Sequence, residues 1–145
     1  MEPEKKLTRD EALEAFLTDR IKEYNNNLSP SHRAIRQEGA VSPFYAVFRD
    51  AQGEVEGALW GESFWGWFEV EKLWVREDRR RSGLGSLLMD ACEAEARVRG
   101  CQAVFLTTFG FQAPDFYQAR GYRILGTREN YPPGVTYYWL QKDLG

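Results

Sequence analysis

The sequence has no long apolar run, because charged or polar residues interrupt every stretch well before the roughly 20 residues that cross a membrane. It also has no surplus of basic charge: 19 Lys and Arg residues stand against 22 Asp and Glu residues, which leaves a formal net charge of -3. A general nucleic-acid-binding protein carries a basic surplus. We therefore expect neither a membrane protein nor a nucleic-acid partner.

Metal-ligating and disulfide-forming residues are scarce. There is one histidine, and the two cysteines, Cys92 and Cys101, show no CxxC spacing and no histidine-rich surroundings. We expect no metal site, and we expect both cysteines to be reduced core residues of a cytoplasmic protein. The charged start of the chain, MEPEKKLTRDEA, lacks the apolar core of a secretory signal and also favours the cytoplasm.

The chain does have enough apolar material for a core. Of its 145 residues, 43% are hydrophobic and 14% aromatic, which excludes a disordered chain. Its length fits one domain spanning residues 1–145, without a visible linker or internal repeat.

Hydrophobic periodicity predicts alternating helical and extended segments. A capping-box pair, Thr8 and Glu11, precedes the first of them. In chain order we expect a helix at about 9–26, strands at 44–50, 55–63 and up to 75, a helix at 84–100, a strand at 103–109, a short helix at about 114–120, and a hairpin of 121–130 with 134–144.

The order of these segments predicts an α/β (α+β) fold with one mixed sheet. The early strands and the final hairpin pair antiparallel, whereas a strand–helix–strand unit must cross over. The strand at 103–109 is therefore expected to lie parallel to Leu73–Val75. The result is a mostly antiparallel sheet with one parallel βαβ crossover and flanking helices.

The helix at 84–100 is predicted to be amphipathic. The apolar stripe is expected at Leu84, Leu87, Leu88, Ala91 and Val98, with Glu93, Arg97 and Arg99 facing solvent.

A glycine-containing turn, Arg80-x-x-Gly83-x-Gly85, joins the predicted strand to this helix. A helix N-terminus offers free N–H groups to an anion, and glycines allow a phosphate to approach the backbone. The spacing matches neither a Walker loop nor a dinucleotide fingerprint. The turn is thus either an anion site or a surface turn whose glycines serve only backbone geometry.

Two motifs resemble the GNAT superfamily of N-acetyltransferases. LWVREDRRRSGLGSLLMDACEAEARVRGC is similar to its acetyl-CoA-binding motif, and APDFYQARGY is similar to an Ala-x-x-Phe-Tyr-x-x-x-Gly-Phe/Tyr element downstream. TFGFQAPDFY and ENYPPGVTYYWL resemble a small bacterial subgroup, in which we expect His where this chain has Val135. The resemblance implies the GNAT acyl-CoA N-acyltransferase fold, with acetyl-CoA as co-substrate and no metal.

The resemblance also implies which residues hold coenzyme A. Backbone groups of the strand end pair with the pantetheine arm, at Leu73, Trp74 and Val75. Backbone N–H groups at the start of the helix cradle the pyrophosphate, at Arg81, Ser82, Gly83, Leu84, Gly85 and Ser86. Arg80 orients this loop. Gln112 is a candidate for a further polar contact, because Gly110 stands where many family members have a cofactor-binding Asn.

For the chemistry, Tyr117 matches the family's general acid, since a phenol is protonated at neutral pH. The alternative is that Tyr117 only packs on the core with Phe116. Glu71, and after it Glu69, are the candidate bases. Alternation along a strand would place them on the same face as Leu73 and Val75, although that face is equally compatible with a solvated surface.

Two further residues rank lower as proton acceptors, since Glu62 lies near a turn and His32 lies in a surface loop.

The predicted reaction is acetylation of a primary amine of a small molecule. Alternatives are acetylation of a protein N-terminus or lysine, and a non-catalytic acyl-CoA-binding module. Three aromatic residues could line an acceptor pocket: Trp65, Trp67 and Phe68. The alternative is that they make core or dimer contacts. A homodimer is compatible with the resemblance.

Overall fold

The computed structural model describes all residues 1–145, which form two compact units, Met1–Ala40 and Val41–Gly145. The first unit contains α1 (Glu11–Leu28) and α2 (Pro30–Ala34). None of the helices is long and apolar enough to cross a membrane.

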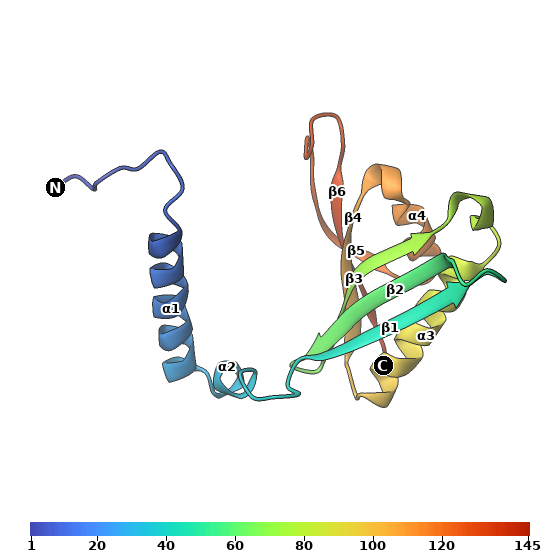
Figure 1. The fold of residues 1–145 in the computed structure, drawn as a ribbon, viewed down its shortest axis with the longest axis horizontal. Helices are drawn as coiled ribbons and strands as arrows, with labels where there is room; N and C mark the ends of the chain where they lie inside the picture. The colour runs from blue at the N-terminus through green and yellow to red at the C-terminus, as the bar shows by residue number, and fades with distance from the viewer. The chain divides into compact units, whose positions relative to one another are not determined.

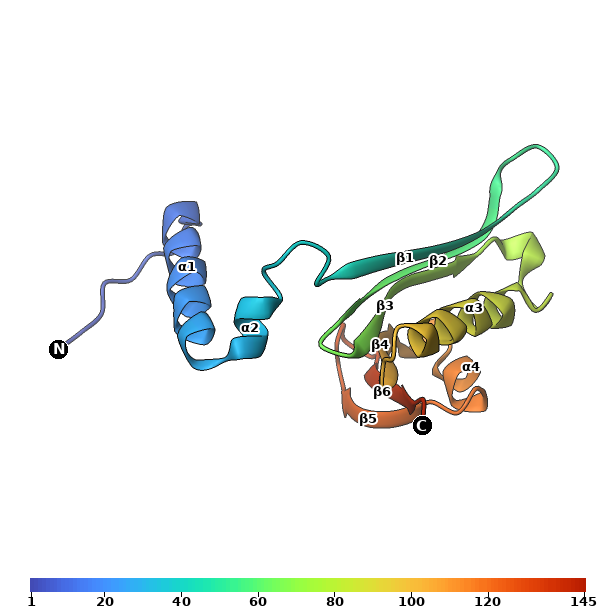
Figure 2. The same cartoon turned by 90° about the horizontal axis from the view of Figure 1, so that it is seen from below.

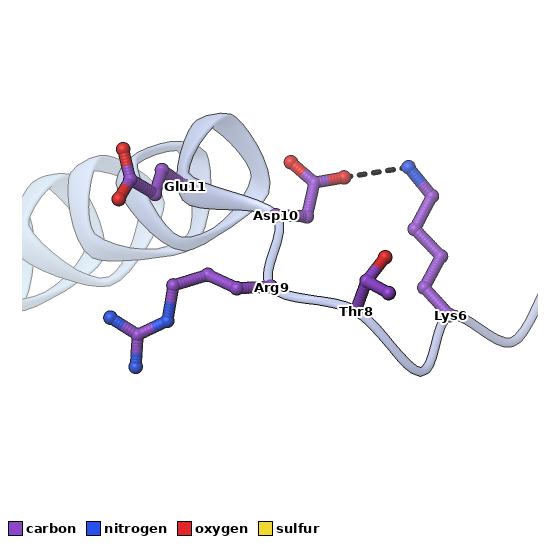
Figure 3. Close-up of a pocket in the computed structure, with 5 residues that line it drawn as sticks. All are labelled: Lys6, Thr8, Arg9, Asp10 and Glu11. Atoms are coloured by element: carbon purple, nitrogen blue, oxygen red, sulfur yellow. Dashed lines mark hydrogen bonds and ion pairs between the residues drawn. The ribbon is translucent and has the colours of Figure 1, made fainter.

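The start of α1 differs from the predicted capping box. The N-cap is Asp10, whose carboxylate accepts a hydrogen bond from the Leu13 N–H at 2.9 Å. A carboxylate at the cap suits the positive end of the helix dipole better than the predicted Thr8 hydroxyl. Lys6 pairs with Asp10 at 2.6 Å, as Figure 3 shows, and this contact is the main reason why the pKa of Asp10 is lowered.

The second unit is built on a six-stranded mixed sheet in the order β1-β2-β3-β4-β6-β5 (Figure 1). The strands are β1 (Ser42–Arg49), β2 (Val55–Phe64), β3 (Trp67–Val75), β4 (Ala103–Phe109), β5 (Arg123–Arg128) and β6 (Tyr137–Asp143). Only β3 and β4 pair in parallel, and all other neighbours are antiparallel. The predicted fold class is therefore confirmed.

Two helices and two short 3-10 turns connect these strands. They are η1 (Glu77–Arg79), α3 (Leu84–Val98), η2 (Gly110–Gln112) and α4 (Pro114–Ala119). Helix α3 packs along one face of the β1–β4 part of the sheet, as Figure 2 shows. The core lies between them, and both cysteines are free and buried in it, as expected.

The buried face of α3 is only partly the predicted one: Leu84 and Leu88 are buried, as predicted, but Ala91 is exposed. Leu87 is 52% exposed and Val98 is 80% exposed, whereas Met89 and Cys92 are fully buried. The residues that face the core are Leu84, Leu88, Met89, Cys92 and Ala96, together with Glu93. The sequence pattern misses this rotation because it assigns Glu93 to solvent on the basis of its charge alone. In the fold that charge is neutralised by partners distant in sequence.

Arg99, also predicted to face solvent, is half-buried instead. Its guanidinium donates hydrogen bonds to the carbonyl oxygens of Ser42 and Pro43 and to the Ser63 hydroxyl, at 2.7 to 3.0 Å. Arg99 therefore fastens the end of α3 to β1 and β2. Arg97 is exposed, as predicted.

A β-bulge interrupts the pairing of β2 with β3. Trp60 pairs with Lys72 but Gly61 pairs with Val70, so Glu71 is an extra residue on β3. A Cβ at Gly61 would collide with the Glu69 carbonyl oxygen and would lie 2.8 Å from Cε1 of Phe68. Only glycine allows this close approach, and the bulge depends on it.

We expect Gly61→Ala to lower the free energy of unfolding by about 1–3 kcal/mol, because the added methyl group forces two backbones apart. Urea unfolding would measure the change. Gly126→Ala is the matched control, since no atom lies within 4 Å of the position that its Cβ would take. Equal stability of the two variants would contradict this account of the bulge.

Candidate active site

The site begins where the parallel strands part. Pairing between β3 and β4 covers only Trp67–Glu69 and Ala103–Phe105. The sequence predicts the partner of β4 at Leu73–Val75, but that end of β3 has no strand on its β4 side. The diverging strand ends leave backbone hydrogen-bonding groups without a sheet partner.

A pocket of about 990 Å³ occupies this gap. Its walls come from the unpaired ends of β3 and β4, the loop into α3, η2 and α4. The predicted site residues that line it are Glu71, Leu73, Trp74, Val75, Arg80, Arg81, Gly83, Leu84, Gly85, Ser86, Gln112 and Tyr117. Glu69 and Ser82 are the predicted site residues outside this lining. The Ser82 hydroxyl instead donates a hydrogen bond to the carbonyl oxygen of Arg79.

The loop into α3 has the geometry of an anion cradle. Arg81 and Gly83 both have left-handed backbone conformations, with φ of 62° and 89°. Gly83 is the N-cap of α3 and offers no side chain to the free N–H groups of the first turn. Such N–H groups, at the positive end of a helix dipole, favour an anionic ligand.

The arginines of this loop have different partners. Arg80 donates from Nε to the Val75 carbonyl oxygen at 3.2 Å and so ties the loop to the end of β3. Nε of Arg79 lies 3.7 Å from the buried Glu56 carboxylate. Arg81 is exposed and makes no ion pair, so its charge is available to a ligand at the pocket.

Gly85 lies against α4 rather than in open space. A Cβ there would be 3.4 Å from Cζ of Phe116 and 3.8 Å from Cγ2 of Val75. A bulky side chain at this position would displace Phe116 and with it the neighbouring Tyr117. The glycine thus allows close packing of two helices beside the pocket.

Tyr117 is both a core residue and a pocket residue. It is only 8% exposed, and its ring packs edge-on against Phe116 at 5.0 Å. Burial raises the pKa of its phenol to about 12, with a smaller contribution from Cys92. A phenol is protonated at neutral pH even at its ordinary pKa of 10, and burial shifts its deprotonation further above neutral pH.

The bulge changes which β3 side chains share a face. Leu73 and Val75 pack against the core, as Phe68 and Val70 do, while Lys72 and Trp74 are exposed. The prediction that Glu69 and Glu71 share a face with Leu73 and Val75 is wrong, because the extra residue reverses the alternation at Glu71.

Three carboxylates are grouped here instead. Glu62 on β2 lies opposite Glu69 in the register, and Glu71 is the bulged residue beside it. The pKa of Glu69 is raised from 4.5 to about 7, first by a hydrogen bond with Glu71, then by burial and by the negative charges of Glu71 and Glu62. Sequence reasoning ranks Glu62 low, although the hairpin register could have placed it opposite Glu69.

Gln112 acts on the end of β4. Its side-chain oxygen accepts a hydrogen bond from the Phe109 N–H at 3.0 Å. Gly110 donates its own N–H to the Thr136 carbonyl oxygen at 2.8 Å, and a Cβ there would lie 3.4 Å from that oxygen. Gly110 therefore lies against the backbone that leads into β6, at the position where the family pattern predicts an asparagine.

The aromatic residues predicted for an acceptor pocket do not line this pocket. Phe68 is fully buried in the core, and neither Trp65 nor Trp67 lines the pocket. Phe109 and Phe111 line it instead, with their rings stacked at 5.6 Å. Phe109 is the last residue of β4 and Phe111 lies in η2, and no periodic pattern marks the point where a strand ends in a 3-10 turn.

We expect Glu71→Gln to move the pKa of Glu69 from about 7 back towards 4.5, because Glu71 is the largest cause of the shift. The variant removes a like charge and leaves an amide that can donate to the carboxylate. A ¹³C NMR titration of the glutamate carboxyl groups would measure it. Glu77→Gln, on the exposed η1 turn, should leave the Glu69 titration unchanged. An unshifted Glu69 in Glu71→Gln would contradict the paired-carboxylate geometry.

Residues 8–122 match the Acetyltransferase (GNAT) family. The blasticidin-S acetyltransferase of Streptomyces morookaense is 40% identical over 131 residues, which cover 86% of this chain and 96% of that protein. An acetyltransferase from Bacillus cereus superposes with a TM-score of 0.80 at 25% identity, over 97% of each chain.

The fold is also shared with a more distant acetyltransferase. An aminoglycoside 6'-N-acetyltransferase crystallised with coenzyme A superposes with a TM-score of 0.63 at 18% identity, covering 90% of this chain and 92% of that chain. No group of three or more His, Cys, Asp or Glu side chains here is arranged to hold a metal ion. With a family match over most of its length, this chain belongs to the GNAT family and is an acetyl-CoA-dependent N-acetyltransferase.

Proposed function

We propose that this enzyme acetylates a primary amine of a cationic small molecule, with Tyr117 as the general acid. The observation that carries the proposal is that a protonated, buried phenol and Glu71, which is hydrogen-bonded to Glu69, line the same gap between β3 and β4. Blasticidin S is the first acceptor to test, because a relative named for its acetylation is 40% identical to this chain.

The residues of the pocket fit coenzyme A. The unpaired backbone of Leu73–Val75 would hydrogen-bond the amides of the pantetheine arm. The N–H groups of 81–86 would bind the pyrophosphate, with added charge from Arg81. Gln112 supports this wall by holding the Phe109 N–H.

The carboxylates supply the proton acceptor. As the amine nitrogen bonds to the thioester carbon, Glu71 takes the amine proton, directly or through water, and shares it with Glu69. The pKa of Glu69 is raised to about 7, so this carboxyl group titrates near neutral pH, where a general base works best. Their negative charge, together with Glu62, also attracts a cationic acceptor.

Tyr117 completes the transfer. When the C–S bond breaks, its phenol donates a proton to the departing thiolate, and a backbone N–H of β3 near Leu73–Val75 stabilises the oxyanion formed before that step. The amine thus becomes an amide, the thioester becomes a free thiol, and exchange with solvent restores the carboxylate pair and the phenol.

We expect Tyr117→Phe to lower kcat for blasticidin S acetylation by about 100-fold, the usual loss when a general acid is removed. The Kd for acetyl-CoA should not change, because the phenol acts on the departing sulfur. Thiol release assays and calorimetry would give the two values. Tyr45→Phe, a tyrosine 70% exposed on β1, is the control and should keep full activity. Full kcat in Tyr117→Phe would refute the acid role.

We expect Arg81→Glu to weaken acetyl-CoA binding by about tenfold, since a charge-assisted contact with phosphate becomes a repulsion. Arg97→Glu makes the same change of net charge at the exposed end of α3 and should bind normally. Isothermal titration at two salt concentrations would separate local from long-range effects. Equal weakening in both variants would argue against a phosphate site at this loop.

A further inference from the structure

A buried carboxylate lies outside the pocket lining and outside the set of residues that the reaction uses. The Glu93 side chain, on α3, is only 4% exposed. It binds three partners from other elements: Lys142 Nζ at 2.5 Å, Arg120 Nη2 at 2.9 Å and the Tyr122 hydroxyl at 3.2 Å. One side chain thus connects α3 with the chain that follows α4 and with β6.

A charged group is an unfavourable way to fill a core. Moving a carboxylate out of water costs several kcal/mol, and a leucine of similar size would fit the apolar face of α3. The charges do balance, because Glu93 and Asp90 are set against Arg120 and Lys142. A paired buried charge contributes defined directions of contact, which an apolar side chain does not.

Two of these partners, Arg120 and Tyr122, also contact Tyr117. Its carbonyl oxygen accepts hydrogen bonds from the N–H groups of Arg120 and Tyr122, both at 3.0 Å. The Tyr122 ring packs edge-on against the Tyr117 ring with centroids 5.8 Å apart. Two of the three partners of Glu93 therefore hold Tyr117, one by its backbone and one by both backbone and ring.

We propose that Glu93 is a positioning residue for Tyr117. Its carboxylate fixes Arg120 and Tyr122, and these fix the end of α4 so that the phenol stays directed at the pocket. The proposal rests on the acid role of Tyr117 given above, and it assigns no chemical step to Glu93. A proton donor misplaced by a fraction of an ångström transfers its proton slowly, even when both substrates bind normally.

The test separates positioning from general stabilisation. We expect Glu93→Gln to lower kcat about tenfold, while the KM for the amine and the Kd for acetyl-CoA stay within about twofold. Glu95→Gln is the matched control: it removes a carboxylate that pairs with Arg99 at 2.9 Å on the same helix but has no link to α4. Glu95→Gln should lower the free energy of unfolding but leave kcat unchanged.

Tyr122→Phe provides a second variant if Glu93→Gln does not fold. It removes one hydrogen bond to the Glu93 carboxylate and leaves all charges in place, and we expect a loss of kcat of about threefold or more. A folded Tyr122→Phe with full kcat would overturn the proposal.

A double-mutant cycle then asks whether Glu93 acts through Tyr117. Once the phenol is gone its position no longer matters, so Glu93→Gln in the Tyr117→Phe background should cost at most about twofold more. If the two losses multiply, Glu93 does not act through Tyr117 and the proposal fails while the acid role stands. If Tyr117→Phe alone keeps full kcat, the acid role fails first, and the positioning role fails with it.

Discussion

The early end of the parallel pairing between β3 and β4 is the constraint on which the site depends. Had the two strands stayed paired beyond Glu69 and Phe105, the backbone groups of Leu73–Val75 would be bonded within the sheet and no pocket would exist. Divergence creates both an opening and a row of unsatisfied backbone groups, which must find a partner in water or in a ligand. A long, narrow co-substrate rich in amides is well matched to such an edge.

The bulge at Glu71 gives the same strand a second function. Without the extra residue, strict alternation would send Glu69, Glu71, Leu73 and Val75 to one face, and either the carboxylates or the apolar side chains would be misplaced. With it, Leu73 and Val75 pack into the core while Glu69 and Glu71 meet Glu62. Gly61 is the residue on β2 whose lack of a side chain makes this possible. The bulge therefore lets one nine-residue strand direct its apolar side chains into the core and its carboxylates to the other face.

Local features could be predicted from the sequence, and features that depend on contacts between separate segments could not. The loop from Arg80 to Gly85, the order of the elements and the placement of Tyr117 in a helix after β4 follow from short motifs and periodicity. The bulge depends on how β2 meets β3, and Glu93 is buried because Arg120 and Lys142 come to it from distant parts of the chain. Charge alone assigns Glu93 to solvent, since no local pattern shows where its partners lie. The N-cap of α1 is Asp10 rather than the predicted Thr8, because both residue types are good N-caps and local sequence does not choose between them.

Although the net charge is only -3, negative and positive side chains are concentrated at different places along and after β3. The carboxylates occupy its middle, and the arginines follow its C-terminal end, where Arg79 is held by Glu56 and Arg80 by the Val75 carbonyl oxygen. An anionic co-substrate and a cationic acceptor would therefore be drawn to different parts of one strand, and each part would repel the wrong partner. Tyr117 lines the same pocket and is protonated, and hence neutral, at neutral pH. In the proposed acid role, a neutral phenol would act on the thiolate without attracting either substrate to the wrong position, and a lysine or a carboxylate there would not share that property.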